Sequence, residues 1–264
     1  MRTVTHLGRE TAYRRVDRGG SGPGCCFVHG SGGNRRLFNA QLSLADRVPV
    51  TALDLSGHGD SQDVSADAGY PTLSAYADDV LAVLEETGDR VLVGNSLGGA
   101  VILHLLIERD PPVDAVVLVG TGARLGVLDD LLEWLESDFE RAIDFLHEPG
   151  RLFAAPDPNV VERSKDVLRE TGQRVTSRDY RTCHRFDVRE EVSSIDVPAL
   201  VVYGVEDRLT PPWFHDHLAT ELPDADLIEI EDAAHMTMIE RPEAFNEAIE
   251  SFLAERFEIG TQTE

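Results

Sequence analysis

Short runs of β-branched and aliphatic residues alternate with stretches of helical periodicity along most of the chain, and this alternation limits the fold more than any other feature. We predict six core strands, at Cys25–Val28, Val50–Leu55, Arg90–Gly94, Ala115–Val119, Ala199–Tyr203 and Asp226–Ile230. Because these runs are almost continuously apolar, both faces of each strand should be covered. The pattern predicts an α/β fold with a mostly parallel sheet and helices on both faces.

Helical patterns fill most of the intervals between these strands. We predict helices at Arg35–Ala45, Thr72–Thr87, Leu97–Arg109, Pro212–Leu222 and Pro242–Arg256. The segment from Thr3 to Val16 alternates in polarity and predicts an antiparallel hairpin at the edge of the sheet. The polar tail from Glu258 to Glu264 is expected to fray.

One interval, residues 121–195, contains no convincing core strand and is too long for a simple crossover. Its helical patterns centre on Leu128–His147, Asn159–Thr171 and Ser177–Val192. We therefore predict that residues 1–120 and 196–264 form the core and that residues 121–195 form an inserted helical cap. Trp134 is a candidate for lining an apolar pocket under this cap, although packing within the cap would also explain it.

The charge of the chain excludes several classes of partner. The 264 residues carry 48 Asp and Glu against 24 Lys and Arg, a formal charge of −24, so nucleic acid and anionic membrane surfaces are disfavoured. Lys165 is the single lysine. Abundant acid with almost no lysine predicts a halophilic, salt-adapted protein, and a GC-rich genome that favours arginine codons is the alternative explanation.

Cysteine usage and hydropathy predict a cytoplasmic location. Cys25 and Cys26 are adjacent and Cys183 is distant, so the three cysteines form no disulfide framework. The first residues lack a secretory leader pattern, and no apolar run approaches the ~18 residues of a membrane-spanning helix.

The segment Gly94–Gly98 reads G-x-S-x-G between a predicted strand and a predicted helix. In this arrangement the serine lies on a tight turn with its hydroxyl exposed, and the flanking glycines avoid clashes that side chains would cause. The following helix directs its first N–H groups toward developing negative charge. We predict that Ser96 is a nucleophile.

A serine nucleophile needs a base and an acid that orients the base. Among nine histidines, His235 stands out because it follows the last strand, at the edge of the sheet where ligands bind in open α/β folds. His215 and His217 are expected on a surface helix. Asp207 follows the strand Ala199–Tyr203 and is the predicted acid, whereas the adjacent Glu206 should point elsewhere.

The small-residue loop His29–Gly33 follows a strand and can present a backbone N–H to a substrate oxygen. Ser31 is the first choice for this donor and Gly32 the second, with the Leu97 N–H as the other donor. Gly30, Gly32 and Met236 are further candidates for contact with substrate. His29 is expected to brace the loop.

A second turn, Asp54–Ser61, contains a histidine and an acid that could suggest another base and orienter. His58 and Asp60 lie in a stretch that requires unusual backbone angles. We predict that both are structural.

Together the motifs resemble the α/β-hydrolase superfamily, specifically its small capped serine branch of carboxylesterases, cofactor-free haloperoxidases and carbon–carbon bond hydrolases. They stand as HGSGG (29–33), DLSGHGDS (54–61), GNSLGG (94–99), GVEDRLTPP (204–212) and AAHM (233–236). The resemblance implies Ser96 as nucleophile, His235 as base, Asp207 as its orienter, and the Ser31 and Leu97 amides as the oxyanion hole. It implies no metal and no organic cofactor. A serine at the elbow argues against dehalogenases and epoxide hydrolases, which have aspartate there.

The commonest activity of a capped serine member is hydrolysis of small carboxylic esters, so the resemblance implies a small-molecule ester substrate. Three alternatives remain open: a carbon–carbon hydrolase of a ring-cleavage product, a perhydrolase or haloperoxidase, and a small-molecule receptor whose cap is a moving lid. The segment after His235 lacks the tryptophan expected of the first, and Arg124, Arg174 or Arg185 could bind an acid group. The oligomeric state is left open.

Overall fold

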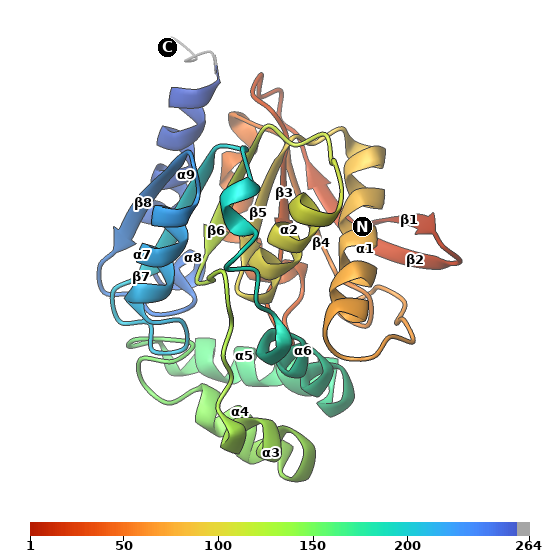
Figure 1. Cartoon of the computed structure of the whole chain (residues 1–264), viewed down its shortest axis with the longest axis vertical. Helices are drawn as coiled ribbons and strands as arrows, with labels where there is room; N and C mark the ends of the chain where they lie inside the picture. The colour runs from red at the N-terminus through yellow and green to blue at the C-terminus, as the bar shows by residue number, and fades with distance from the viewer. Residues whose placement is uncertain (258–264) are drawn as a thin grey trace.

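The computed structural model describes residues 1–257, and the predicted fraying of Glu258 to Glu264 falls outside this range (Figure 1). Eight strands form one sheet in the order β1-β2-β4-β3-β5-β6-β7-β8. Their bounds are β1 Arg2–His6, β2 Arg9–Val16, β3 Cys25–Val28, β4 Val50–Leu53, β5 Val91–Asn95, β6 Ala115–Val119, β7 Ala199–Gly204 and β8 Ala225–Ile230. β1 and β2 form the predicted antiparallel hairpin, and the strands from β4 to β8 pair in parallel. The predicted α/β fold is confirmed.

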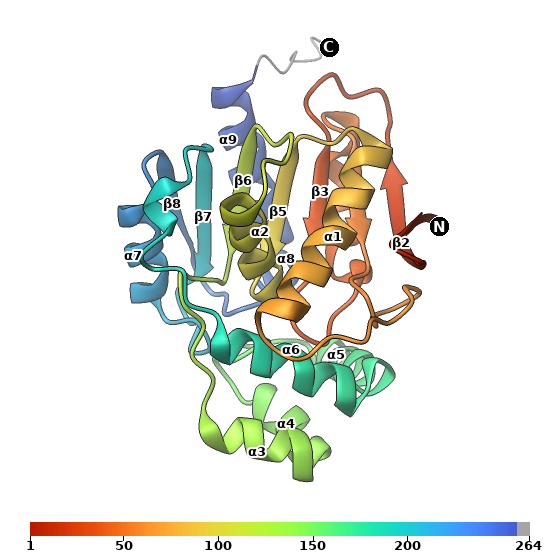
Figure 2. The same ribbon diagram turned by 45° about the vertical axis from the view of Figure 1, so that its right-hand side comes forward.

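Helices cover both faces of the sheet (Figure 2). One face carries α1 (Tyr70–Thr87), α2 (Leu97–Glu108) and α7 (Pro212–Glu221). The other carries α8 (Thr237–Glu240), α9 (Pro242–Arg256) and the 3₁₀ helices η1 (Arg35–Phe38) and η2 (Ala40–Asp46).

Alternate residues of the central strands enter the two cores. In β3, Cys26 and Val28 pack against the α1 and α2 side, whereas Cys25 and Phe27 pack against the α9 side. All four side chains are fully buried. Because a strand points successive side chains to opposite faces, burial on both faces requires an uninterrupted apolar run.

The helix predicted over Arg35–Ala45 was wrong in type, since two 3₁₀ helices occupy this stretch. The Asn34 side chain caps η1 by accepting a hydrogen bond from the Arg36 amide, and Asn39 ends η1 before η2 begins. The side-chain cap of Asn34 thus starts η1, and the backbone amide of Asn39 closes it by donating to the Arg36 carbonyl.

Four α-helices and the short 3₁₀ helix η3 (Val192–Ser194) lie between β6 and β7. We call residues 129–185, which contain the four α-helices, the helical insertion. They are α3 (Asp129–Ser137), α4 (Phe139–Leu146), α5 (Pro158–Thr171) and α6 (Gln173–Arg185). Figures 1 and 2 show them beyond the end of the sheet at which the parallel strands finish. The single pattern predicted over Leu128–His147 is two helices, because Asp138 caps α4 by accepting a hydrogen bond from the Arg141 amide at 3.2 Å.

The helical insertion has an apolar cluster of its own, which includes Leu135, Ile143 and Phe153. Trp134 packs at the edge of this cluster, with its ring 5.1 Å from that of Phe145 and the Arg141 guanidinium 4.1 Å from its ring centre. Within residues 1–257, no helix combines the length and apolar character needed to cross a membrane.

Candidate active site

Ser96 lies at the junction of β5 and α2 with a positive φ of 54°, a conformation that is uncommon for a residue with a side chain. The neighbouring glycines have no space for a side chain. A Cβ at Gly94 would lie 2.6 Å from the Gly98 carbonyl oxygen, and a Cβ at Gly98 would lie 2.2 Å from the Val28 carbonyl oxygen. The strained turn that the G-x-S-x-G pattern predicts is therefore present.

His235 and Asp207 lie side by side, although they follow different strands, β8 and β7 respectively. The His235 Nδ1 and Asp207 Oδ2 atoms are 2.8 Å apart and both side chains are buried. The second carboxylate oxygen of Asp207 accepts hydrogen bonds from the Leu209 and Thr210 amides at 2.8 and 3.0 Å. With Nδ1 held by the carboxylate, the Nε2 atom of His235 is left as a proton acceptor.

Thr210 completes this arrangement and was not predicted. Its hydroxyl donates to Asp207 Oδ2 at 2.7 Å and lies 3.2 Å from His235 Nδ1. Burial alone would raise the pKa of the Asp207 carboxyl, but the charge of His235 and hydrogen bonds from His235 and Thr210 hold that pKa below its usual value. The sequence signal was a threonine three residues after the candidate acid.

Ser96 and His235 both line a cavity of about 270 Å³. Its wall combines Phe145 and Tyr180 of the helical insertion with Trp213 of the core. The Ser96 hydroxyl makes no hydrogen bond to His235 or to any other side chain in the described range 1–257. Such contacts often form only when substrate is bound.

The predicted oxyanion donors differ in their surroundings. Ser31 lines the cavity, and neither its backbone N–H nor that of Leu97, the first residue of α2, donates to an acceptor within residues 1–257. The Gly32 amide is engaged, since it donates to Asp179 Oδ2 at 3.0 Å. Of the two choices made from sequence, Ser31 therefore has the free amide.

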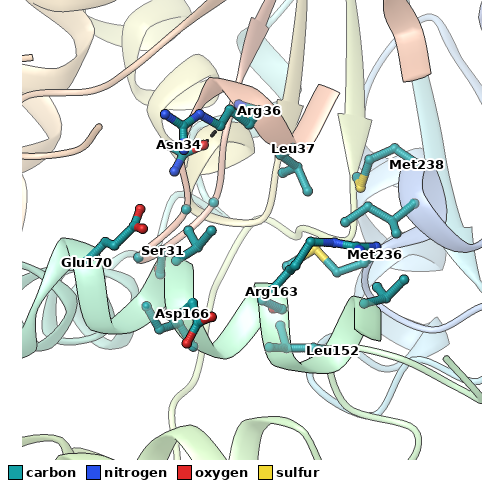
Figure 3. Close-up of a pocket in the computed structure, with 18 of the residues that line it drawn as sticks. Ser31, Asn34, Arg36, Leu37, Leu152, Arg163, Asp166, Glu170, Met236 and Met238 are labelled. Carbon is teal, nitrogen blue, oxygen red and sulfur yellow. Dashed lines mark hydrogen bonds between the residues drawn. The ribbon is translucent and has the colours of Figure 1, made fainter. Parts of the chain in front are cut away.

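The remaining candidate contacts lie elsewhere. Gly30, Gly32 and Met236 line a second cavity of about 530 Å³, which Figure 3 shows between α5 and the loop that follows β3. Ser31 and Tyr180 line both cavities. Three arginines and one tryptophan proposed from sequence line neither: Arg124, Arg174, Arg185 and Trp134.

His29 is structural, as predicted. Its Nδ1 atom donates to the Gly30 carbonyl at 2.8 Å, and its Nε2 atom accepts from the Leu55 amide at 3.1 Å. Burial lowers the pKa of His29 to about 4, so the ring is neutral at pH 7.

His58 and Asp60 do not pair with each other. His58 Nε2 lies 2.8 Å from Asp179 Oδ2 in a fully buried pair, and Asp60 instead binds Arg35 at the surface. The structural roles predicted for both residues are confirmed, but the partner of His58 comes unexpectedly from α6.

Two further groups near the site are buried. The prediction that His215 lies at the surface was wrong: it is fully buried, with its ring stacked 4.7 Å from that of Tyr203. Cys183 lines the first cavity, and burial raises the pKa of its thiol to about 12, so it is not a competing nucleophile at neutral pH. Within residues 1–257, no group of three or more His, Cys, Asp or Glu side chains is arranged to hold a metal ion.

The model of the α/β hydrolase family matches residues 27–248. The chain is 31% identical over 234 residues to the pimeloyl-[acyl-carrier protein] methyl ester esterase of Neisseria meningitidis serogroup C, covering 83% of this chain and 89% of that protein. Two solved structures are similar over 96% of this chain. The first, a thermophilic esterase, is 32% identical with a TM-score of 0.84, and the match covers 97% of its chain. The second, the enol-lactonase from Burkholderia xenovorans LB400, is 25% identical with a TM-score of 0.86, and the match covers 100% of its chain.

These matches agree in family and in general chemistry. They support a hydrolase function of the esterase type. The geometry and the matches together show that the chain belongs to the α/β-hydrolase family.

Proposed function

We propose that this protein is a serine hydrolase that cleaves small carboxylic esters through an acyl-enzyme on Ser96. The observation that carries the proposal is that Ser96, on its positive-φ turn, shares one cavity with a histidine whose Nδ1 atom lies 2.8 Å from the buried Asp207 carboxylate. The names of the similar proteins support an ester as the bond that is broken.

In the proposed mechanism, His235 Nε2 takes the proton of Ser96 as the Oγ atom attacks the ester carbonyl. The tetrahedral oxyanion accepts hydrogen bonds from the Ser31 and Leu97 amides. The partial positive charge at the N-terminal end of α2 stabilises it further. His235 then protonates the departing alcohol. A water molecule, deprotonated by the same histidine, attacks the acyl-enzyme and releases the carboxylic acid.

The helical insertion acts in this proposal as the cap, within the boundaries 121–195 predicted from sequence. Backbone hydrogen bonds join it to both catalytic loops: Arg208 to Gly150 at 2.8 Å, His235 to Arg151 at 3.3 Å and Met236 to Leu152 at 3.0 Å. A lid that swung away as a rigid body would break all three. This linkage favours a fixed cap over a receptor with a moving lid.

The test is hydrolysis of p-nitrophenyl acetate, butyrate and octanoate in molar KCl, with wild type beside Ser96→Ala. We expect turnover by the wild type and loss of at least 10³-fold in the variant, with chain-length preference reporting the size of the cavity. A fluorophosphonate should label the wild type and not the variant. Equal rates in two folded proteins would contradict the proposal and direct attention to carbon–carbon hydrolysis, perhydrolysis and ligand binding.

A further inference from the structure

Two arginines line the cavity that contains Ser96 and His235, although the protein as a whole is acidic. Asp and Glu outnumber Lys and Arg by 48 to 24 in the chain, yet within residues 1–257 this cavity is lined by two arginines, Arg151 and Arg208, and by no acidic residue. The second cavity is lined by residues of both signs, the arginines Arg36 and Arg163 and the acids Asp166 and Glu170 (Figure 3).

Arg151 is held in place at the cavity wall. Its Nη1 atom lies 2.8 Å from Glu148 Oε2, and its guanidinium lies 3.2 Å from the centre of the Phe145 ring. Burial and the nearby charge of Arg208 lower the pKa of Arg151, while Glu148 opposes them. Nη1 also donates to the Phe145 carbonyl, whereas the Nε and Nη2 atoms of Arg151 donate to no acceptor within residues 1–257 and are left to bind a carboxylate.

Arg208 lies beside Arg151 without an acid of its own. Its backbone amide donates to the Gly150 carbonyl at 2.8 Å, next to Arg151 in the chain. Its side chain forms no ion pair with any residue in the described part of the chain. Glu148, the carboxylate paired with Arg151, is 59% exposed and does not line the cavity, so Arg208 is the cation of this wall that has no paired carboxylate within residues 1–257.

The other arginines of this region have surface partners instead. Arg124 lies 3.8 Å from Asp187, Arg174 binds Asp63, and Arg185 donates to the Ala68 carbonyl at 2.6 Å. The positive charge in the cavity is thus confined to Arg151 and Arg208.

We propose that the substrate is an ester that also bears a carboxylate, and that Arg208 and Arg151 bind this carboxylate while the ester carbonyl lies at Ser96. The proposal rests on the ester hydrolysis proposed above and narrows its substrate class to half-esters of dicarboxylic acids. Apolar walls such as Leu131 and Phe214 lie along the same cavity and suit the methylene chain between the two groups. A guanidinium fork recognises a carboxylate through two parallel hydrogen bonds.

The experiment compares monomethyl adipate, an anion at pH 7.5, with neutral methyl hexanoate, following methanol release at one fixed ionic strength. We expect wild-type kcat/KM to favour the anionic ester by about tenfold, as for one charge-assisted contact at a partly exposed site. Arg208→Gln should bring this ratio near one, Arg208→Lys should retain part of it, and Arg208→Glu should invert it. The change should lie mainly in KM, because the carboxylate is bound in ground and transition states alike.

Arg124→Gln is the matched control, since it removes an arginine close to the cavity but outside its lining. It should leave the ratio at the wild-type value. A wild-type ratio of one or less, or the same ratio in wild type and Arg208→Gln, would overturn the inference. Ser96→Ala separates the two proposals. If this variant still hydrolyses both esters, the proposal of ester cleavage at Ser96 is wrong. If it hydrolyses neither, and wild type has equal kcat/KM for the two esters, only the proposed carboxylate preference is wrong.

Discussion

The carboxylate of Asp207 is held by more than its contact with His235. The Leu209 amide, the Thr210 amide and the Thr210 hydroxyl each donate a hydrogen bond to it. These donors stabilise the ionised form of Asp207 and fix its orientation. In the proposed mechanism they would keep the carboxylate in place while His235 gains and loses a proton. At the scale of single residues, the acid is therefore positioned independently of the state of the base.

Replacing Asp207 by asparagine should lower kcat for p-nitrophenyl butyrate by about 10⁴-fold. The amide can donate to His235 Nδ1, which selects the tautomer whose Nε2 carries the proton and cannot accept one from Ser96. Glu206→Gln is the matched control, because this neighbouring acid is exposed. A comparable loss in both variants, or little loss in Asp207→Asn, would count against the assignment.

His215 should make the protein less stable in acid. Burial lowers the pKa of this histidine from 6.5 to about 4, so below pH 6.5 the unfolded chain binds a proton that the folded chain does not. Stability from this group is present above pH 6.5 and is lost as the pH falls toward 4. His215→Phe keeps a ring against Tyr203 and removes the titration.

As the pH falls from 7 to 4, wild type should lose up to about 3 kcal/mol more free energy of unfolding than His215→Phe. Urea denaturation at pH 7, 5.5 and 4 measures the difference. The exposed position His217 of the same helix, changed to Phe, controls for removal of a histidine. Parallel pH curves for wild type and His215→Phe would contradict the prediction.

At the scale of elements, Asp179 joins α6 to the core. Its fully buried carboxylate accepts from Tyr76 of α1 at 2.7 Å and from the Gly32 amide at 3.0 Å, and it lies 2.8 Å from His58 Nε2. Burial raises the pKa of Asp179, but His58, the Gly32 amide and Tyr76 outweigh this and hold it below its usual value. The buried contact thus ties the helical insertion to the loop that contains Ser31.

Asp179→Ala should lower the free energy of unfolding by about 3–5 kcal/mol, because it leaves His58, Tyr76 and the Gly32 amide without their buried acceptor. It should also lower kcat more than it raises KM. The Gly32 amide binds Asp179, and the adjacent Ser31 amide is the proposed oxyanion donor, so its position should change when Asp179 is removed. Denaturation and steady-state kinetics test the two effects. Glu162→Ala, which removes an exposed acid of α5, should change neither. Equal stability of the two variants would refute the role of Asp179.

At the scale of the whole molecule, the formal charge of −24 should make stability depend on salt. We propose, as the composition predicts, that the protein is adapted to concentrated salt. The Debye length is ~3 Å at 1 M salt and ~30 Å at 0.01 M, so dilution exposes the surface carboxylates to one another. Several buried carboxylates are paired with a basic side chain. The repulsion that salt should screen is therefore between carboxylates at the surface.

We expect the midpoint of urea unfolding to fall as KCl is reduced from molar to about 10 mM. Circular dichroism at each salt concentration measures the change. Sucrose at matched osmolality stabilises proteins by being excluded from their surface but does not screen charge. It should therefore not restore the unfolding midpoint that is lost when KCl is removed. A midpoint independent of KCl would contradict salt adaptation and favour the GC-rich explanation of the arginine bias.

The sheet and the turn at Ser96 can both be predicted from local patterns in the sequence. A strand covered on both faces must be apolar throughout, as Cys25–Val28 is, and the turn needs glycine where any Cβ would collide with backbone. Both requirements are local, so both are visible in a single chain. The proximity of Asp207 and His235 can be predicted in the same way. Both residues follow parallel strands, and parallel strands have their carboxyl ends at one edge of the sheet.

The surroundings of these residues, in contrast, depend on tertiary packing. His58 meets Asp179 across 121 positions of the chain, and Arg151 reaches the cavity from the helical insertion while Trp134 does not. Helical periodicity indicates which face of a helix is apolar but not where that helix lies against the core. The contacts that select a substrate therefore depend on how the insertion packs, and that packing arises from long-range contacts that no local pattern encodes.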